Sequence, residues 1–431
     1  MMSTARNIFL TALMGPALIL AQNAGGLTLD QLLDIGLSNN SDIRIAEHNL
    51  QTARSNRRGS FSGLVPSLQT SIFRDMNPRQ TLTTSGTLQD AEAFSSSFTI
   101  SQTIFDGAQS WYNAASGRNQ VEGSTASLDV ARLQTVLFIK QSYFSYLSFR
   151  ALLEVAGEAL ILSERQLDLV QERFKLQAVR ETDLLKAKVS TGQRRADVHT
   201  ARQRLTEAGT QLNMVLGIDP LAPINIADEE VALAQMPGRE ESFARMSRLN
   251  PQLQAQAYAV KGAQISAKMQ RGVLMPTIRL SYSASALGSA LDEVFDGTTL
   301  GNNSRTSLAI SLPLFTGLRN SSSYSRARYF ALAEEERLSS LERDLRRQLE
   351  NTFSNLETLL LVHPINEEVL ASAQADVRLA EEQYNLGAIS ILDLLNAQVS
   401  LITAKSTRVR TIYDVKSAEA QLQALTGTPV E

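Results

Sequence analysis

The sequence predicts a mainly α protein with a small β part, built from a duplicated helix–strand–strand–long helix–helix unit. The chain matches itself at a shift of 210 residues, for example at Asp183 and Asp393. Each copy holds a stretch of about 69 residues with helical composition, preceded by two runs that alternate polar and apolar residues. Only 23 Gly and 11 Pro in 431 residues leave few helix breakers, as long helices require.

Composition and charge exclude several classes of function. Lys and Arg number 41 against 44 Asp and Glu, so no basic surplus is available to bind nucleic acid. The chain has no Cys, which rules out disulfides, thiolate metal sites and cysteine nucleophiles. Its three His, at 48, 199 and 363, have no metal-ligand spacing. No nucleophile elbow, phosphate loop or HExxH motif occurs, so we expect no cofactor, no metal site and no enzyme activity.

The first 21 residues predict an export signal. Arg6 precedes an apolar stretch that ends in Ala21, where we expect cleavage. The alternative is a buried first helix, because only one basic side chain precedes the apolar run. No later stretch of about 18 apolar residues is present, so no helix is expected to span a membrane. The mature protein is therefore expected to be exported.

The duplication divides the mature chain. Pro, Gly and Asp landmarks recur in the same order: Pro66 and Pro276, Gly107 and Gly317, Asp183 and Asp393, Gly217 and Gly427. We expect a first structural repeat at 22–220, a linker at 221–239 and a second repeat at 240–431. The offset is far longer than solenoid repeats of about 20–50 residues, so one large unit has been duplicated.

Each repeat is predicted to open with a helix, at 28–63 and 240–272, ended by Pro66 or Pro276. Strands are predicted at 66–74, 94–105, 276–285 and 305–315, joined in pairs by long polar loops at 75–93 and 285–303. Long helices follow at 108–176 and 318–386, each about 100 Å long at 1.5 Å per residue. The last helices, at 183–216 and 392–425, carry heptad spacing. Pro364 predicts a kink or local break in the second long helix.

The strand runs are apolar on one side and rich in Ser and Thr on the other. Half-buried strands of a soluble sheet have the same pattern, but so do outer-membrane strands with long outer loops. Four strands cannot close a membrane barrel, since spanning barrels start at about eight strands and leave no open edge. If these strands cross a membrane, several chains must each contribute a sheet.

Several sequence blocks resemble the TolC-type outer-membrane efflux family over essentially the whole mature chain. They are Ile104-Phe105-Asp106-Gly107, Leu314-Phe315-Thr316-Gly317, Arg173–Leu176, Thr182–Ala187, Gln383–Gly387 and Leu392–Ala397. The resemblance implies a homotrimer with a 12-stranded transmembrane β-barrel, continued by a 12-helix periplasmic coiled-coil tube. It also implies the Gram-negative outer membrane, contact with its lipid, a periplasmic adaptor (membrane fusion) protein and an inner-membrane pump. Such a protein is the exit duct of a tripartite efflux or type I secretion system. The alternative is an exported periplasmic coiled-coil scaffold protein.

The resemblance also implies working residues at the turns between the long and last helices. Gate positions of the family match Asp183, Tyr384, Asp393 and Asn396. Adaptor-docking turns match Leu176, Gln177, Val179, Arg180, Leu386, Gly387, Ala388 and Ser390. Three departures concern these sites. Gln177 stands where the second copy has the turn glycine Gly387, the family's arginine is Ile389, and a second aspartate of some members is Asn396, which argues against a full salt-bridge lock. Asp183 and Asp393 are also placed to cap the last helices, and the two roles are compatible.

Two further groups of residues have alternative interpretations. Trp111 and Tyr112, just after a strand end, suit either an aromatic belt at the membrane interface or packing at the transition from strand to helix. Asp292, Glu293 and Asp296 in the second outer loop are compatible with a cation site, but a solvated loop is the favoured interpretation.

Overall fold

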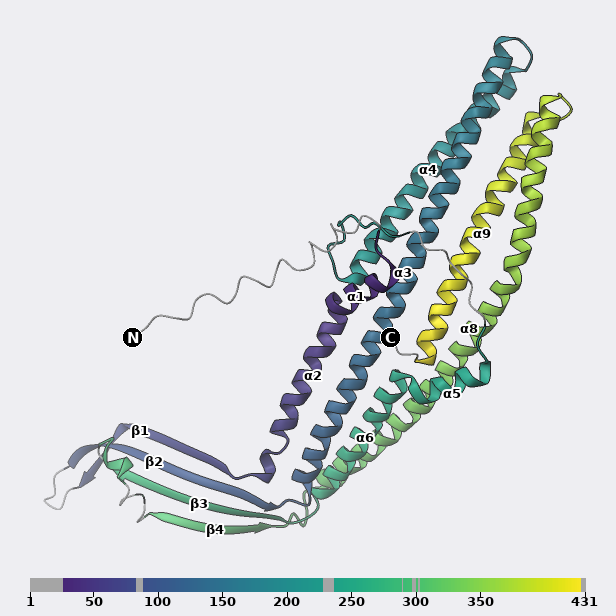
Figure 1. Ribbon diagram of the computed structural model, residues 1–431. Helices are drawn as coiled ribbons and strands as arrows, with labels where there is room; N and C mark the ends of the chain where they lie inside the picture. Colours follow the sequence, from purple (N-terminus) through teal and green to yellow (C-terminus); the bar gives the residue numbers. More distant parts are fainter. Residues whose placement is uncertain are drawn as a thin grey trace. The chain divides into compact units, whose positions relative to one another are not determined.

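The computed structural model describes residues 26–82, 88–227, 236–288, 290–296, 300 and 303–427, so the expected export signal lies outside the described residues. The chain is mainly helical, with one small antiparallel sheet (Figure 1). It divides into two compact units: Met1–Ile45, Asp129–Asn250 and Arg343–Glu431 form the first, and Ala46–Leu128 with Pro251–Glu342 form the second. None of the described helices is both long enough and apolar enough to cross a membrane.

The first unit contains two long helical hairpins. Helices α3 (Gln109–Lys175) and α8 (Arg319–Asn385) extend into it from the second unit, and each turns back as α4 (Glu181–Leu216) or α9 (Ile391–Thr426). Near the base of the first hairpin, α1 (Leu29–Asn39) packs Leu32 against Ile139 and Leu212, all fully buried. In the second repeat, α5 (Arg239–Leu249) pairs Arg239 with Glu350 and Glu357 of α8. Of these helices, α4 and α9 are the last helices for which the sequence shows heptad spacing.

The opening helix of each repeat is two helices, not one. The helix predicted at 28–63 is α1 followed by α2 (Ser41–Gly59), and the helix predicted at 240–272 is α5 followed by α6 (Pro251–Gly272). The breaks lie at Asn40 and Asn250, which both have extended backbone. Each Asn donates its side-chain amide to a carbonyl of its own repeat's last helix, Val215 at 2.8 Å and Leu425 at 3.0 Å. Asparagine favours such local breaks because its side chain bonds backbone groups.

Of the kink or local break predicted at Pro364, the break is wrong, because α8 is continuous from Arg319 to Asn385, and the kink stays a prediction. Proline removes one backbone hydrogen bond from a helix, but contacts just beyond it hold the segment. Asn366 donates to the Thr411 hydroxyl of α9 at 2.9 Å, and Arg408 of α9 donates to Glu367 at 2.6 Å. Packing against α9 therefore overrides the local preference.

The second unit holds a four-stranded antiparallel sheet in the order β1-β2-β3-β4 (Figure 1). The strands are β1 (Ser67–Leu82), β2 (Leu88–Phe105), β3 (Thr277–Gly288) and β4 (Ser304–Ser311). Most of the long loop predicted at 75–93 is strand, since β1 and β2 continue to pair as far as Leu82 and Leu88 after a register shift between Asp75 and Arg79, and residues 83–87 lie outside the described residues. Cross-strand pairing outweighs the polar composition that predicted a loop. β4 stops at Ser311, short of the predicted 315, because Pro313 has no N–H to donate to a sheet.

The second predicted loop, 285–303, is also partly structured. β3 runs on to Gly288, and a single 3₁₀ turn forms at Glu293–Phe295. Val294 in this turn is fully buried, and its carbonyl accepts a hydrogen bond of 2.5 Å from the Ser96 hydroxyl of β2. An apolar residue in the middle of a polar segment therefore fixes the turn to the sheet.

Candidate functional site

The two helical hairpins end in matching turns, which we call the first tip turn (176–180) and the second tip turn (386–390). In the first, the N–H groups of Gln177 and Ala178 donate to the carbonyls of Phe174 and Arg173, at 2.9 and 2.8 Å. In the second, Gly387 and Ala388 donate in the same pattern, at 3.0 and 2.9 Å. This pair of bonds is the Schellman motif, which satisfies the last carbonyls of a helix.

The same left-handed backbone occurs at different residue types in the two tip turns. Gly387 has φ of 74° and Gln177 has φ of 57°. Glycine adopts this region without a Cβ clash, whereas another residue pays about 1–2 kcal/mol. Gln177 therefore leaves the geometry of the first tip turn intact, although its backbone is strained because a Cβ is present at a left-handed φ.

The helices that leave the tip turns begin differently. Ser390 caps α9 in a capping box: its hydroxyl accepts from the Asp393 N–H, and the Asp393 carboxylate accepts from the Ser390 N–H at 3.1 Å and hydroxyl at 2.7 Å. These hydrogen bonds hold the pKa of the Asp393 carboxyl below its usual value. Arg180 stands at the equivalent position of α4 and makes no side-chain capping bond.

The capping role predicted for the two aspartates needs correction. Asp393 is not the N-cap of its helix. The helix begins at Ile391, Ser390 is the N-cap, and Asp393 is the third helical residue, which completes the capping box. Asp183 occupies the equivalent third position of α4, which begins at Glu181. Each helix starts earlier than predicted because Arg180 and Ser390 carry the extended backbone that precedes a helix.

The tip turns expose two leucines at equivalent places. Leu176 is 79% exposed and Leu386 is 84% exposed. Five more residues of the predicted docking turns are also exposed, namely Gln177, Arg180, Gly387, Ala388 and Ser390. Val179 is half-buried, since it packs with Ile389 against the core below. Each hairpin therefore ends in one solvent-facing leucine.

Below the turns lies a small core, which we call the tip core. It draws on all four long and last helices, and its most buried members are Val170, Leu394 and Ile391. Tyr384, a predicted gate residue, lies in this core and is only 7% exposed. Among the described residues its hydroxyl finds no hydrogen-bond partner. Burial raises the pKa of the Tyr384 hydroxyl, and the negative charge of Asp183 adds to this effect.

Arg173 links the two hairpins at the tip, and sequence reasoning did not single it out. Its guanidinium lies 5.3 Å from the centre of the Tyr384 ring and donates to the Asn385 side-chain oxygen at 2.9 Å. Its positive charge partly offsets the rise in the pKa of Tyr384. The sequence signal that could have identified Arg173 is its position in the last turn of a helix, where a basic side chain is favourable.

The predicted gate residues fall into two pairs. Asp183 lies close enough to Tyr384 to influence its titration, and both are at least half-buried. Asp393 and Asn396 are exposed, three residues apart on α9. Residues at this spacing share one face of a helix. The second pair is therefore accessible to other molecules, whereas in the first pair Tyr384 belongs to the tip core and the half-buried Asp183 lies near it.

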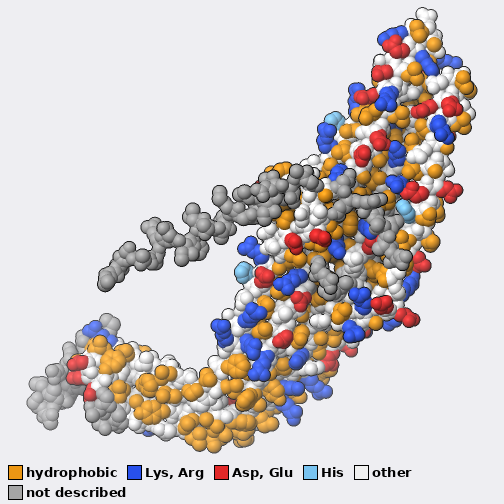
Figure 2. Space-filling view, in the orientation of Figure 1, with side chains coloured by type: hydrophobic (Ala, Val, Ile, Leu, Met, Phe, Trp, Pro, Cys, Tyr) orange, Lys and Arg blue, Asp and Glu red, His pale blue; other side chains and the backbone are white. Residues whose placement is uncertain are grey.

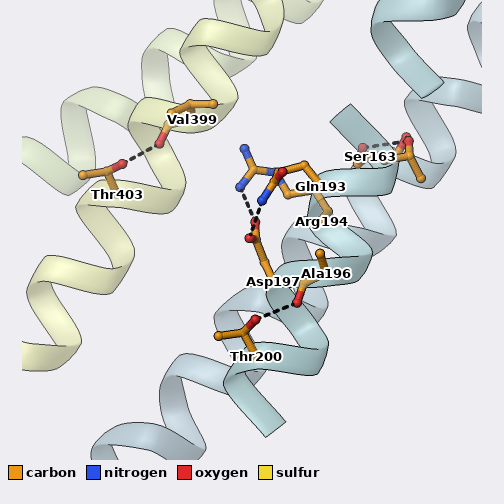
Figure 3. Close-up of polar contacts among 9 residues, drawn as sticks. Ser163, Gln193, Arg194, Ala196, Asp197, Thr200, Val399 and Thr403 are labelled. Atoms are coloured by element: carbon orange, nitrogen blue, oxygen red, sulfur yellow. Dashed lines mark hydrogen bonds and ion pairs between the residues drawn. The ribbon is translucent and has the colours of Figure 1, made fainter. Parts of the chain in front are cut away.

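Farther from the tip, polar contacts lie both within α4 and between α4 and α3 (Figure 3). Gln193 and Arg194 both donate to the Asp197 carboxylate, at 3.1 and 3.0 Å, and Ser163 meets Thr191 at 3.0 Å. A groove of about 270 Å³ lies beside them, with Phe149 and Leu152 among its lining residues. These contacts hold the helices in place, and the residues that make them do not form a catalytic arrangement.

The sheet has two chemically different faces. Residues 68, 72, 100, 280, 308 and 310, all aliphatic and exposed, share one face with the exposed Tyr282, and we call this the apolar face. The opposite side, the hydroxyl face, carries mainly Ser and Thr. Figure 2 shows hydrophobic side chains spread over the sheet. An exposed apolar surface of this kind marks contact with lipid or protein.

The remaining predicted site residues are placed as follows. Trp111 is 68% exposed and Tyr112 is half-buried, at the start of α3. The interfacial position of Trp111 and its packing at the transition from strand to helix both stay predictions. Glu293 opens the 3₁₀ turn, with Asp292 before it and Asp296 after it. Nowhere in the described ranges do three or more His, Cys, Asp or Glu gather as metal ligands would.

Comparisons with known proteins match this arrangement. A family model described as outer membrane efflux protein matches residues 32–218 and 245–428. The outer membrane efflux protein BepC of Brucella suis is 25% identical over 394 residues, which cover 90% of this chain and 81% of BepC. The outer membrane protein TolC of Escherichia coli is 25% identical over 351 residues, covering 79% of this chain and 70% of TolC.

Solved structures share the fold at low sequence identity. The Campylobacter jejuni CmeC outer membrane channel superposes with a TM-score of 0.84 at 16% identity, covering 93% of this chain and 85% of CmeC. A CusC structure gives 0.83 at 19% identity, covering 95% and 96%. The chain therefore belongs to the outer membrane efflux protein family, a family of channel proteins, and its place is the Gram-negative outer membrane, with the helical part in the periplasm.

Proposed function

We propose that this protein is the outer-membrane exit duct of a tripartite efflux or type I secretion system. In this proposal three copies form a passive channel with a 12-stranded β-barrel and a 12-helix periplasmic tube. A periplasmic adaptor and an inner-membrane pump open it at the tip turns. The export signal at 1–21 and the repeats at 22–220 and 240–431 belong to the same proposal.

The observation that carries the proposal is the open sheet. Its apolar face is exposed, and its two edge strands, β1 and β4, have no partner on their outer side in the described chain. Unpaired edges do not persist in a lipid bilayer, because each unbonded backbone group there costs several kcal/mol. β1 and β4 run in opposite directions, so β4 of one copy can pair antiparallel with β1 of the next. Copies therefore close the sheet by extending the same meander.

The rest of the chain supports the same assembly. Each copy supplies four helices of the two hairpins, α3, α4, α8 and α9, so three copies supply a 12-helix tube. In the proposal, outer-membrane lipid covers the apolar face, and Trp111 and Tyr112 lie at the membrane interface. The exposed Leu176 and Leu386 suit docking of an adaptor, because covering an apolar side chain at the end of a hairpin removes apolar surface from water.

The test of the assembly is membrane fractionation followed by electrophoresis with and without heating. We expect the mature protein in the outer-membrane fraction, migrating as a trimer that heating dissociates. Replacing β4 residues Leu308 and Ile310 by Lys should prevent membrane insertion, whereas Lys at exposed Leu361 of α8 should not. A wild-type protein found wholly in the soluble fraction, with no heat-labile trimer, would favour the alternative, an exported coiled-coil scaffold.

The gate belongs to the same proposal. Repeated by three-fold symmetry, Asp393 would place three carboxylates near the axis, with Asn396 one turn farther along α9. We expect Asp393→Ala to raise single-channel conductance in a planar bilayer. Ser390→Ala is the matched control, because it removes the capping box and keeps the carboxylate. Equal effects of both changes would reduce Asp393 to a capping residue.

A further inference from the structure

The hydroxyl face of the sheet carries a continuous row of serines. The register pairs Ser67 with Ser101, Ser101 with Ser281 and Ser281 with Ser307, so one row across all four strands consists of serine. The hydroxyls of Ser67 and Ser101 are 2.8 Å apart, and those of Ser281 and Ser307 are also 2.8 Å apart. In each pair one hydroxyl donates its single proton to the other, so at most one O–H per pair is left to donate elsewhere, while all four hydroxyls keep acceptor capacity.

Two arginines flank the serine row on the same face. Arg305 lies two residues from Ser307 along β4, and Arg279 lies two residues from Ser281 along β3, toward the opposite end of the sheet. Two residues of a strand span about 7 Å, so the two arginine positions bracket the row at similar distances. Both side chains are exposed.

The charge on this part of the sheet is of one sign. The side chains described for the four strands, at residues 67–74, 94–105, 277–288 and 304–311, include Arg74, Arg279 and Arg305 and no Asp or Glu. Arg74 belongs to the opposite face and lies over the Phe94 ring. Arg279 and Arg305 therefore face no described carboxylate on the strands that surround them.

We propose that the hydroxyl face lines the channel and makes its barrel section selective for anions. This inference rests on the proposed trimer, in which the apolar face meets lipid and the hydroxyl face meets the lumen. Three copies then form a ring of Arg279 and a ring of Arg305, with the serine row between them. Positive rings of side chains raise the local concentration of anions and repel cations.

The chemistry of the rings indicates the class of solute. Guanidinium groups donate paired hydrogen bonds that match carboxylates and phosphates, and serine hydroxyls donate to the same groups. The barrel section therefore favours solutes that carry carboxylate or phosphate groups. The tip differs, because Asp393 gives that section negative charge, so the two ends of the duct would act on charge in opposite senses.

The test is the reversal potential of the purified trimer in a planar bilayer under a KCl gradient. Wild type is compared with Arg279→Ala/Arg305→Ala, and Arg279→Lys/Arg305→Lys is the control that keeps the charge. All three share the same tip, so its contribution cancels. We expect the ratio of chloride to potassium permeability to fall about threefold or more in the Ala variant and to persist in the Lys variant. Heat-labile trimers on a gel show that each variant has assembled.

Inorganic tripolyphosphate, added on the outer side, provides a second measurement. We expect it to reduce the wild-type current and to leave the current of the Ala variant unchanged. Open channels with the same permeability ratio in wild type and the Ala variant would overturn anion selectivity and leave the duct intact. A wild-type protein that gives no conductance at all would overturn the channel itself, and the selectivity with it.

Discussion

The two tip turns reach one backbone shape by different means. The second tip turn has glycine at its left-handed position and a capping box between Ser390 and Asp393. The first tip turn has Gln177 at the strained position and Arg180, without a side-chain bond, before its last helix. The second turn is thus stabilised by its own sequence. The first depends on the tip core beneath it and on the contacts of Arg173 across to the other hairpin.

The largest expected effect comes from the tip core, because both turns rest on it. Leu394→Ala removes a fully buried side chain and should destabilise the tip by about 3 kcal/mol. Amide hydrogen exchange of the solubilised full chain should quicken at both tip turns, and more at the first. Leu392→Ala, at an exposed neighbouring position, is the control and should change little. Faster amide exchange at the second tip turn alone would show that the first tip turn does not depend on the tip core.

Loss of the capping box should come next. Ser390→Ala removes the hydroxyl that caps α9 and should cost about 1 kcal/mol, seen as faster exchange of the first α9 amides. The matched change Arg180→Ala should cost nearly nothing, because Arg180 makes no capping bond. Equal losses at the two positions would contradict the contrast between the turns.

The pH dependence of the second turn follows from the same hydrogen bonds. The pKa of Asp393 is lowered in the folded chain, so its contribution to stability is present above the ordinary carboxyl pKa near 3.9. That contribution is lost as pH falls through the lowered value. We expect exchange of the α9 start to quicken on acidification in wild type, and much less in Asp393→Asn. An equal response of the two proteins would show that another group titrates.

Exchanging the left-handed residues should give smaller effects. Gly387→Gln copies the first turn into the second and should cost about 1 kcal/mol or less in net stability, because the strain of about 1–2 kcal/mol from a Cβ at φ of 74° is partly offset by the lower flexibility of the unfolded chain. The change is measured by exchange at the amides of residues 387 and 388. An unchanged rate would mean that the turn accepts a side chain without strain.

The smallest effect is expected from the reverse change. Gln177→Gly relieves strain but makes the unfolded chain more flexible, so the net gain should be only a few tenths of a kcal/mol. Slower exchange at residues 177 and 178 is the expected observation. A loss of stability would indicate that the Gln177 side chain makes a favourable contact in the assembled protein.

Sequence predicted the elements that repeat and missed those that depend on packing. The strands, the long helices and the paired tip turns could be predicted because each has a local sequence signal. These signals are the alternation of polar and apolar residues, helical composition, and residues that recur at the 210-residue offset. The uninterrupted helix through Pro364 was not, since contacts of Asn366 and Glu367 with α9 decide it. The helix breaks carried a signal in Asn40 and Asn250, which recur at the 210-residue offset, but a single Asn within a helical pattern did not reveal its bond to a distant carbonyl.

The candidate site divides in the same way. The resemblance supplied Asp183, Tyr384 and the turn residues by position. The burial of Tyr384 and the place of Arg173 over its ring depend on how the two hairpins meet, which no spacing encodes. Arg279 and Arg305 can be read from the sequence, but only the strand register shows that both lie on the same face of the sheet as the serine row.

The bonds of Asn40 and Asn250 bear on the order in which the protein folds. Each joins the opening helices of one repeat to the last helix of the same repeat, over an identical separation of 175 residues. The first of these closures is complete once residue 215 is available, while the second repeat is still to follow during synthesis and export. The sheet, by contrast, pairs β2 with β3 and needs both repeats. The helical part of the first repeat can therefore form early, and barrel assembly must wait for the whole chain.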